Sequence, residues 1–495
     1  MTRRTSGTTW GIFLFWGAAL VLSFLNLSGD LMNDDEGTYL YAAWRTGLGE
    51  VPYRDFSLVQ APLGFYLGAA VFKLFGPAVW PARALSVLFL LGAAFLVFES
   101  ARRFLKLKTG FALAAAGVFL FNKHVFFLGR SFMPDVPMIF FGTAALFFAL
   151  RAESSGPDGG RASQAALLAG VMAGLSALAK INGVLIFAGY PAFLFLEAVR
   201  RRKTWKTAAS RAASAAAGFA ASFAVPFGFF LVFVPGTFDA VVGFQAARES
   251  AASVPFILQA GRRIAHLIGN HNYGLAAGAL AALSAGRAGA EENAAGLRRI
   301  RVLLWTSAAA VLAVIFVPGD FFIRYAVFAF VPLALLFGAG GEALAEGKTI
   351  GRRITLGFVA ALTLLCLGPT LSPKKILARD EGTRAAAAFI RQNTKPADYV
   401  FGDDPFLNFL ARRPCPPDLV DVSEAMIEAG RITTAEVVED CDLFNVKMVF
   451  VETGVSAHHL VKLKDYAAFR GYLSRRFRPA AAIRREFLNV EFFIR

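Results

Sequence analysis

Long apolar runs separated by short polar segments fill the first three quarters of the chain. A transmembrane α-helix needs about 20 consecutive apolar residues. Eleven runs reach or approach that length, at 10–28, 81–101, 109–122, 132–150, 164–180, 182–198, 212–234, 264–285, 301–318, 321–341 and 354–371. The pattern predicts a polytopic α-helical membrane protein with about eleven transmembrane helices. One further apolar segment, 61–76, is short and contains Lys73, so we expect an interfacial or re-entrant helix there.

Basic residues gather in short runs between the apolar segments. These runs are Arg3-Arg4, 101–108, 200–206, 298–301 and 347–353. Lys and Arg are enriched in cytoplasmic loops of membrane proteins, and eleven spans place all five runs on one side. We therefore expect a cytoplasmic N-terminus, an outer loop at 29–80 and an extracytoplasmic C-terminus, in the plasma membrane or, where there are two membranes, the inner one.

The apolar character ends near residue 371. The remaining segment, 372–495, contains the helix-like stretch "EGTRAAAAFIRQNT" and the strand-like stretches "DYVFG" and "VKMVFVE". Strands that alternate with helices predict a soluble α/β domain, long enough to form its own core. Asp403 and Asp404, in "GDDPF", are interpreted as surface acids of a turn. The chain thus divides into a membrane domain, 1–371, and an extracytoplasmic domain, 372–495.

Composition supports the membrane class and narrows the function. The chain is 56% hydrophobic, its mean hydropathy is +0.53, and its net charge is +16. Such a charge in a soluble protein suggests a nucleic-acid partner, but here the basic residues lie between apolar runs, so we expect contact with membrane lipids and no nucleic acid. The three cysteines lack metal-ligand spacing, and we predict neither a metal nor a cofactor. Cys415 and Cys441 could form a disulfide if their segment faces an oxidising compartment.

The remaining ionisable residues fall mostly at the predicted outer ends of the spans. Charged groups at membrane depth are costly and mark functional sites. Each has a simpler interpretation: an acid at a helix start interacts with the helix dipole, and Lys or Arg reaches toward lipid headgroups. Three consecutive acids exceed what one helix dipole explains. The set predicts a site for a phosphorylated or otherwise anionic lipid beside a proton acceptor. It consists of Asp34, Asp35, Glu36, Arg130, Asp135, Lys180, Asp320 and Arg324.

Several of these residues lie in a pattern with a known counterpart. Asp35-Glu36 follows the first span, Gly49 to Asp55 contains Pro-Tyr-Arg-Asp, Ala61-Pro62-Leu63 opens the juxtamembrane helix, and Arg83 and Asp135 follow. Together with 174–180 and 324–332, this pattern resembles the GT-C superfamily of membrane glycosyltransferases. Within it, the pattern resembles the branch that holds protein O-mannosyltransferases and lipid A aminoarabinose transferases.

The resemblance implies an enzyme that transfers a sugar from a polyprenyl-phosphate carrier to a protein, lipid or polysaccharide acceptor on the outer face, with inversion. Asp35 is then the expected base, and Glu36 and Asp135 position the acceptor or tune that base. Donor-phosphate binding is expected from four residues, Arg130, Lys180, Arg324 and Tyr325. A transporter or flippase of lipid-linked sugars is the main alternative, and a receptor with a soluble binding domain is another.

Overall fold

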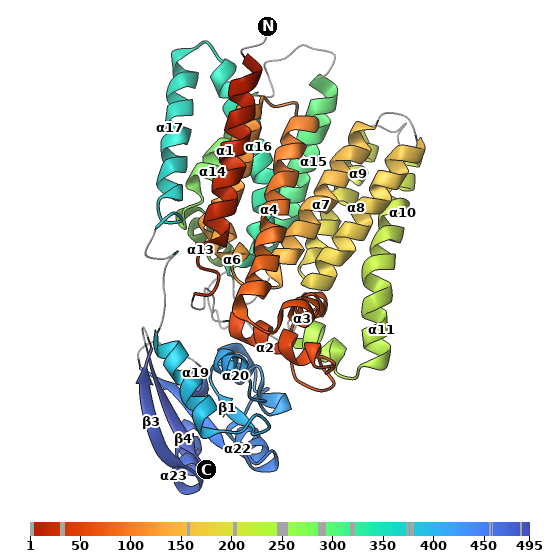
Figure 1. Ribbon diagram of the computed structural model, residues 1–495. Helices are drawn as coiled ribbons and strands as arrows, with labels where there is room; N and C mark the ends of the chain where they lie inside the picture. The colour runs from red at the N-terminus through yellow and green to blue at the C-terminus, as the bar shows by residue number, and fades with distance from the viewer. Residues whose placement is uncertain are drawn as a thin grey trace.

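A computed structural model describes most of the chain. The described residues are 4–29, 35–155, 159–200, 205–244, 256–285, 294–316, 322–372, 376, 381–454, 457, 459–485 and 488–495. The first three quarters of the chain form a helical bundle, and the remainder forms a smaller domain at one end of it (Figure 1).

Helices of membrane-spanning length make up the bundle. Within the described ranges, eight are long and apolar enough to cross a bilayer, or nine if one bent pair counts as a span. They are α4 (Val79–Arg103), α7 (Asp135–Ser154), α8 (Gly159–Ala179), α9 (Gly183–Arg200), α10 (Trp205–Phe219) continued by η2 (Ala220–Ala224) and α11 (Val225–Phe233), α15 (Ala294–Leu312) with η4 (Ala313–Phe316), α16 (Phe330–Glu346) with η6 (Val327–Ala329) before it, and α17 (Ile350–Leu367). The chain is therefore a multi-pass membrane protein, and the count of eleven stays a prediction.

Two apolar stretches are interrupted where single spans were predicted. The segment 109–122 becomes α5 (Thr109–Leu120), which is followed after a 68° bend by α6 (Lys123–Gly129). The prediction of one span at 264–285 is wrong, because α13 (Phe256–Gly269) and α14 (Tyr273–Ala285) are separate helices. Between them His271 has a φ of 64°, a left-handed conformation that ends a right-handed helix. The first apolar run is α1 (Arg4–Phe24), shorter than predicted at its C-terminal end.

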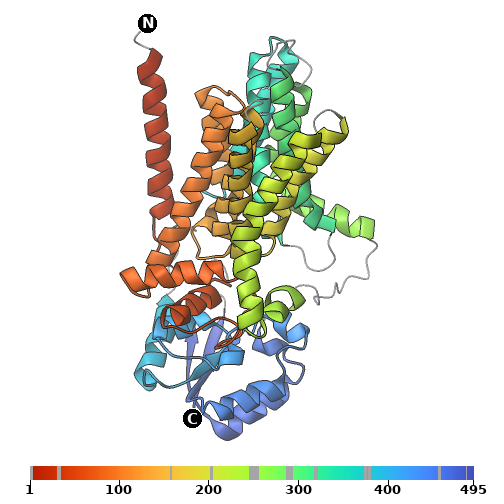
Figure 2. The ribbon, with the colours of Figure 1, turned by 90° about the vertical axis from the view of Figure 1, so that its right-hand side faces the viewer.

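The end of the bundle nearest the C-terminal domain carries two short helices of the outer loop. They are α2 (Glu36–Gly47) and α3 (Leu63–Phe75). The helix expected in 61–76 exists, and with only 13 residues α3 lies across the bundle end (Figure 2). The N-terminus lies at the opposite end of the bundle. Because α4 runs away from α3, the Arg102 and Arg103 in its last turn lie toward that opposite end.

The C-terminal domain contains one four-stranded sheet with the order β1-β2-β4-β3. β1 (Val400–Gly402) is parallel to β2 (Met448–Thr453), whereas β4 (Asn489–Ile494) is antiparallel to β2 and to β3 (Arg478–Arg484). The predicted helix and two predicted strands are present as α19 (Glu381–Asn393), β1 and β2. The β3–β4 pair was not predicted. The other helices are α20 (Pro405–Ala411), η7 (Pro417–Leu419), α21 (Glu424–Glu428), α22 (Thr434–Leu443), η8 (Leu460–Lys462) and α23 (Tyr466–Arg476).

The two aspartates that follow β1 are buried, and their assignment to the surface is wrong. Asp403 accepts hydrogen bonds from the backbone N–H groups of Glu452 and Leu460, both at 2.7 Å. Asp404 accepts from the Phe406 N–H at 2.9 Å and forms an ion pair with Arg485. These acids therefore hold the loops at the edge of the sheet, which a short polar motif does not reveal.

Asp403 gives the domain a specific pH dependence. Burial raises the pKa of its carboxyl to about 6, above the value of about 3.9 in an unfolded chain. The folded state therefore binds the carboxyl proton of Asp403 more tightly than the unfolded state does. The resulting contribution of Asp403 to folding stability is present at low pH and is lost as the pH rises through about 6. Acidification from about pH 7 to about pH 5 is expected to stabilise the fold through this group by about 1 kcal/mol.

Hydrogen exchange of the β1 and β2 amides in the full-length protein measures this contribution as the difference between wild type and Asp403→Asn. The exposed Asp418→Asn is the control for a change of charge. An identical pH response of wild type and Asp403→Asn would contradict the assignment.

Candidate functional site

The first feature of the site is an ion pair between two distant segments. Asp35 immediately precedes α2, and Arg324 lies in the short helix η5 (Ile323–Tyr325) that leads into η6 and α16. Arg324 Nη1 donates to Asp35 Oδ2 at 2.5 Å. Both side chains keep partial access to solvent. This pair brings a potential base and a potential phosphate-binding cation into direct contact across 289 residues of sequence.

A second carboxylate–cation pair joins the starts of two membrane helices. Asp135 is the first residue of α7, where its charge also interacts favourably with the helix dipole. Lys180 lies in the turn between α8 and α9, and its Nζ donates to Asp135 Oδ1 at 2.6 Å. The same Nζ lies 5.4 Å from the centre of the Tyr325 ring. Tyr325 therefore contacts Lys180 while it adjoins Arg324 in the chain.

These two pairs belong to one electrostatic environment. The guanidinium of Arg324 interacts electrostatically with both Asp35 and Asp135, and so does the hydroxyl of Tyr39 on α2. Within the described part of the chain, two buried polar atoms here have no hydrogen-bond partner, Asp135 Oδ2 and Arg324 Nε. One is an acceptor and the other a donor. Because an unpaired buried polar group is costly, these atoms indicate where a ligand would bind.

Glu36 has a different environment from its neighbour Asp35. Its carboxylate forms a bidentate ion pair with Arg83 of α4, with both N–O distances at 2.7 Å, and neither side chain has any exposed surface. The backbone N–H of Phe132 also donates to Glu36, at 2.7 Å. Arg83 in turn donates to the carbonyl oxygens of Leu27 and Gly29. These contacts indicate that Glu36 holds the start of α2, and its predicted role toward the acceptor or the base stays a prediction.

Arg130 likewise binds protein groups. It is buried and donates to the carbonyl oxygens of Ser23, at 3.3 Å, and Leu25, at the end of α1. Its guanidinium also lies 5.3 Å from the centre of the Phe126 ring. A cation there interacts favourably with the C-terminal end of the α1 dipole. These contacts support a role of Arg130 in holding α1. Because its Nη1 has no hydrogen-bond partner among the described residues, phosphate binding by Arg130 stays a prediction.

The predicted site residues thus divide into two groups. Asp35, Asp135, Lys180, Arg324 and Tyr325 come together, whereas Glu36 and Arg130 are buried in contacts that hold α1, α2 and α4. Asp34 and Asp320 lie outside the described residues. Among those described, no three His, Cys, Asp or Glu side chains are arranged to hold a metal ion, and metal independence stays a prediction. The ion pair between Glu36 and Arg83 was not predicted, because their spacing in the sequence does not indicate that they are in contact.

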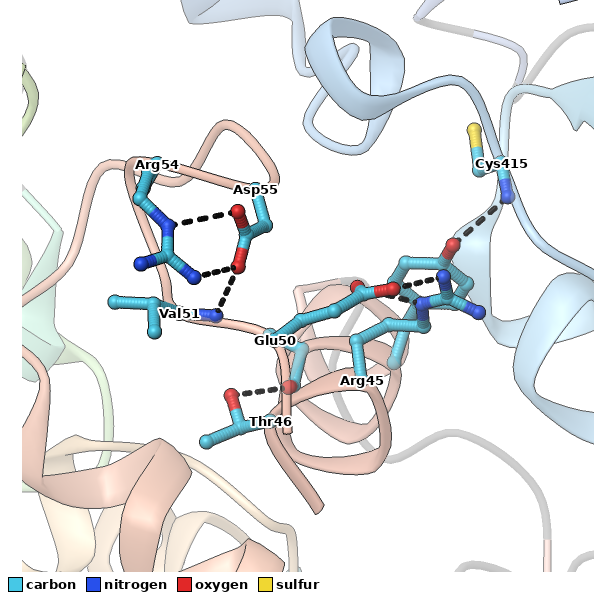
Figure 3. Close-up of polar contacts among 9 residues, drawn as sticks. Arg45, Thr46, Glu50, Val51, Arg54, Asp55 and Cys415 are labelled. Carbon is cyan, nitrogen blue, oxygen red and sulfur yellow. Dashed lines mark hydrogen bonds and ion pairs between the residues drawn. The ribbon is translucent and has the colours of Figure 1, made fainter. Parts of the chain in front are cut away.

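The C-terminal domain is attached to the outer loop beside this site. Figure 3 shows the backbone N–H of Cys415 donating to a hydroxyl on α2, that of Tyr41, at 2.8 Å. Nearby, Arg45 forms an ion pair with Glu50, and Arg54 forms one with Asp55, whose carboxylate also accepts from the Val51 N–H. These contacts order the loop that carries the "GEVPYRD" motif. The thiols of Cys415 and Cys441 are both free and buried.

Comparison with known proteins supports the resemblance predicted from the sequence. Residues 59–228 match the family model of dolichyl-phosphate-mannose-protein mannosyltransferases. No curated protein matches the chain in sequence.

Solved structures of membrane glycosyltransferases share the fold. ArnT from Cupriavidus metallidurans in the apo state has a TM-score of 0.69 at 16% identity, with 98% of each chain covered. The same protein bound to undecaprenyl phosphate has a TM-score of 0.66 at 15% identity, again with 98% of each chain covered. The archaeal oligosaccharyltransferase AglB from Archaeoglobus fulgidus, in complex with an inhibitory peptide and a dolichol-phosphate, has a TM-score of 0.56 at 15% identity and covers 90% of this chain and 69% of its own. At these identities the likeness shows the fold, and with the family match it confirms the predicted GT-C resemblance.

Proposed function

We propose, from the mannosyltransferase family match and the GT-C fold, that the protein is a glycosyltransferase that uses a polyprenyl-phosphate-linked sugar. The sugar would pass to a protein, lipid or polysaccharide acceptor at the outer face of the membrane. The observation that carries the proposal is the pair of adjoining ion pairs, Asp35 with Arg324 and Asp135 with Lys180. They combine carboxylates that can take a proton with cations that can bind a phosphate.

The reaction needs only one protein base. A polyprenyl phosphate is already a good leaving group, so no general acid is required. Asp35 takes the proton of the acceptor nucleophile as it attacks the anomeric carbon. Attack opposite the departing phosphate inverts the configuration at that carbon, by the geometric logic of single displacement.

The cations stabilise the departing phosphate. Charge builds on the phosphate as the glycosidic bond breaks, and preorganised donors lower the energy of that state. Arg324 has the unpartnered Nε available for a phosphate oxygen while Nη1 contacts Asp35. Lys180 offers further N–H donors of its ammonium, and the Tyr325 hydroxyl is a candidate third donor. Asp135 then acts by orienting Lys180.

The location of these groups favours transfer over transport. Asp35, Asp135 and Lys180 lie at the ends of helices on the side of the C-terminal domain. A transporter is expected to bind its substrate near the middle of the membrane, between broken helices. The proposal is tested by deleting the gene and comparing envelope glycans and glycoproteins by mass spectrometry. Unchanged glycans and glycoproteins would overturn it.

Removal of the Lys180 charge is expected to weaken donor binding. A hydrogen bond to a charged group contributes about 1.5–3 kcal/mol, so Lys180→Gln should lower the affinity for undecaprenyl phosphate about tenfold or more. Binding is measured by fluorescence titration of the purified protein. Lys73→Gln, which removes an exposed charge from α3 at the same end of the bundle, serves as the matched control. Equal affinities of Lys180→Gln and wild type would exclude Lys180 from the phosphate site.

A further inference from the structure

A loop of the C-terminal domain is fixed against the outer loop of the membrane domain. The Ser57 N–H donates to the Pro417 carbonyl oxygen at 2.9 Å. The Cys415 N–H donates to the Tyr41 hydroxyl at 2.8 Å (Figure 3). Beyond these contacts Val420 and Val422 are buried. Asp421 lies between them, four residues after Pro417.

The loop that carries Asp421 docks on α2, whose N-cap residue is Asp35, and the Asp421 carboxylate interacts electrostatically with Asp35. Only 9% of the residue is exposed, and burial raises the pKa of its carboxyl, as does the charge of Asp35. The Tyr39 hydroxyl interacts electrostatically with Asp35, Asp135 and Asp421. His459, which precedes η8, also interacts with Asp421. One aspartate of the C-terminal domain thus acts on the same tyrosine hydroxyl as the two aspartates of the membrane domain.

Asp421 differs from those two aspartates in its partners. Asp35 and Asp135 each pair with a cation, whereas the hydrogen-bond donors to Asp421 among the described residues come from Ser423, whose N–H lies 3.2 Å from Oδ1. Burial of a carboxylate with so few donors is unfavourable. Asp135 is fully buried, and its Oδ2 has no hydrogen-bond partner among the described residues. The Asp421 carboxylate and Asp135 Oδ2 can each accept a hydrogen bond from a bound molecule.

The negative charge of Asp421 determines whether the donor or the acceptor binds next to it. A carboxylate repels the phosphate of the donor, which the cations Arg324 and Lys180 attract. The side of the site that Asp421 occupies therefore suits the acceptor, whose nucleophile must lie near Asp35.

We propose that Asp421 is an acceptor-binding residue, which takes a hydrogen bond from an N–H or O–H group of the acceptor next to its nucleophile. The inference rests on the proposed function and adds to it that the C-terminal domain forms part of the active site. The membrane domain supplies the base and the phosphate-binding cations, and the docked loop at 415–423 supplies the contact that orients the acceptor.

The test compares Asp421→Asn with Asp418→Asn, an exposed acid three residues earlier that undergoes the same loss of charge. Reconstituted protein is given lipid extract of the deletion strain as donor source and increasing amounts of its membrane extract, which carries the unmodified acceptor. Asp421→Asn should raise the half-saturating amount of extract about tenfold, the effect of losing one charge-assisted hydrogen bond. Its affinity for undecaprenyl phosphate and its melting temperature should match those of wild type, and Asp421→Glu should restore part of the acceptor affinity.

Three results would overturn the inference. These are an unchanged half-saturating amount for Asp421→Asn, an equal loss in Asp418→Asn, and a loss that is accompanied by weaker undecaprenyl phosphate binding or a lower melting temperature. If Asp421→Asn does not fold, Asp421→Glu is tested instead. An Asp421→Glu protein that folds and matches wild type in the acceptor titration supports the role of the charge. An Asp421→Glu protein that transfers no more sugar than an unfolded chain opposes that role. A wild-type protein that transfers no sugar overturns the proposed function, and this inference with it.

Discussion

Asp35→Asn is expected to lower the rate of sugar transfer by about 10²–10⁴-fold, the usual contribution of a general base. Asparagine has nearly the same shape as aspartate and still accepts a hydrogen bond from Arg324, but it cannot take the proton of the acceptor. Because Asp35 is partly exposed, the chain should insert and fold as before. The rate is measured in reconstituted vesicles with a radiolabelled polyprenyl-phosphate sugar.

The control for Asp35→Asn is Asp239→Asn. Asp239, in η3 (Asp239–Gly243), also pairs with an arginine from a distant segment, Arg431 of the C-terminal domain, but it lies on the surface. Exposed pairs of this kind contribute little to stability, so this variant should transfer at the wild-type rate. Undecaprenyl phosphate binding should persist in both variants. Turnover retained in Asp35→Asn would remove Asp35 from the role of base.

Glu36→Gln is expected to lower the stability of the folded protein strongly. The change leaves the Arg83 guanidinium buried without its counter-charge, and loss of one partner of a buried pair costs about 3–5 kcal/mol. We expect less folded protein in the membrane and a lower melting temperature after purification. Glu50→Gln, which breaks the partly exposed pair with Arg45, should cost no more than about 1 kcal/mol.

A double variant separates the structural role of Glu36 from a catalytic one. Combining Glu36→Gln with Arg83→Gln removes both charges, so part of the stability should return, because the two residues act as a unit. Transfer activity per folded molecule should then return as well. A folded Glu36→Gln protein with normal melting and no activity would instead support the catalytic role first predicted for Glu36.

The membrane architecture was largely predictable because it depends on local sequence. Apolar length sets where a helix can cross a bilayer, and most of the spans lie near their predicted positions. The exception at 264–285 arose because the break at 270–272 depends on backbone conformation, which hydropathy does not measure. The β3–β4 pair was missed because "RPAAAIR" has little of the β-branched and aromatic character of typical strands.

The candidate site was only partly predictable, for a different reason. The side of the membrane on which each acid and cation lies follows from the order of spans, so Asp35, Asp135, Lys180 and Arg324 could be grouped. Which carboxylate pairs with which cation depends on helix packing, and the partners are 45 and 289 residues apart. Asp421 gave no signal at all, because the docking of the two domains alone brings it near Asp35.

Under the proposed function, the end of the α10–α11 rod nearest the C-terminal domain indicates the depth at which the donor is met (Figure 1). Phe229, Val232 and Phe233 of α11 are exposed, so lipid chains extend to that level, and the rings of Tyr53 and Tyr66 pack on Phe230 beside them. Tyrosines at such a boundary are typical of the headgroup region. The lipid-linked donor of the proposed reaction would carry its phosphate at this depth and would reach the site by moving sideways in the membrane. The encounter with the donor is then a search in two dimensions, and its frequency depends on the number of carrier molecules per unit area of membrane.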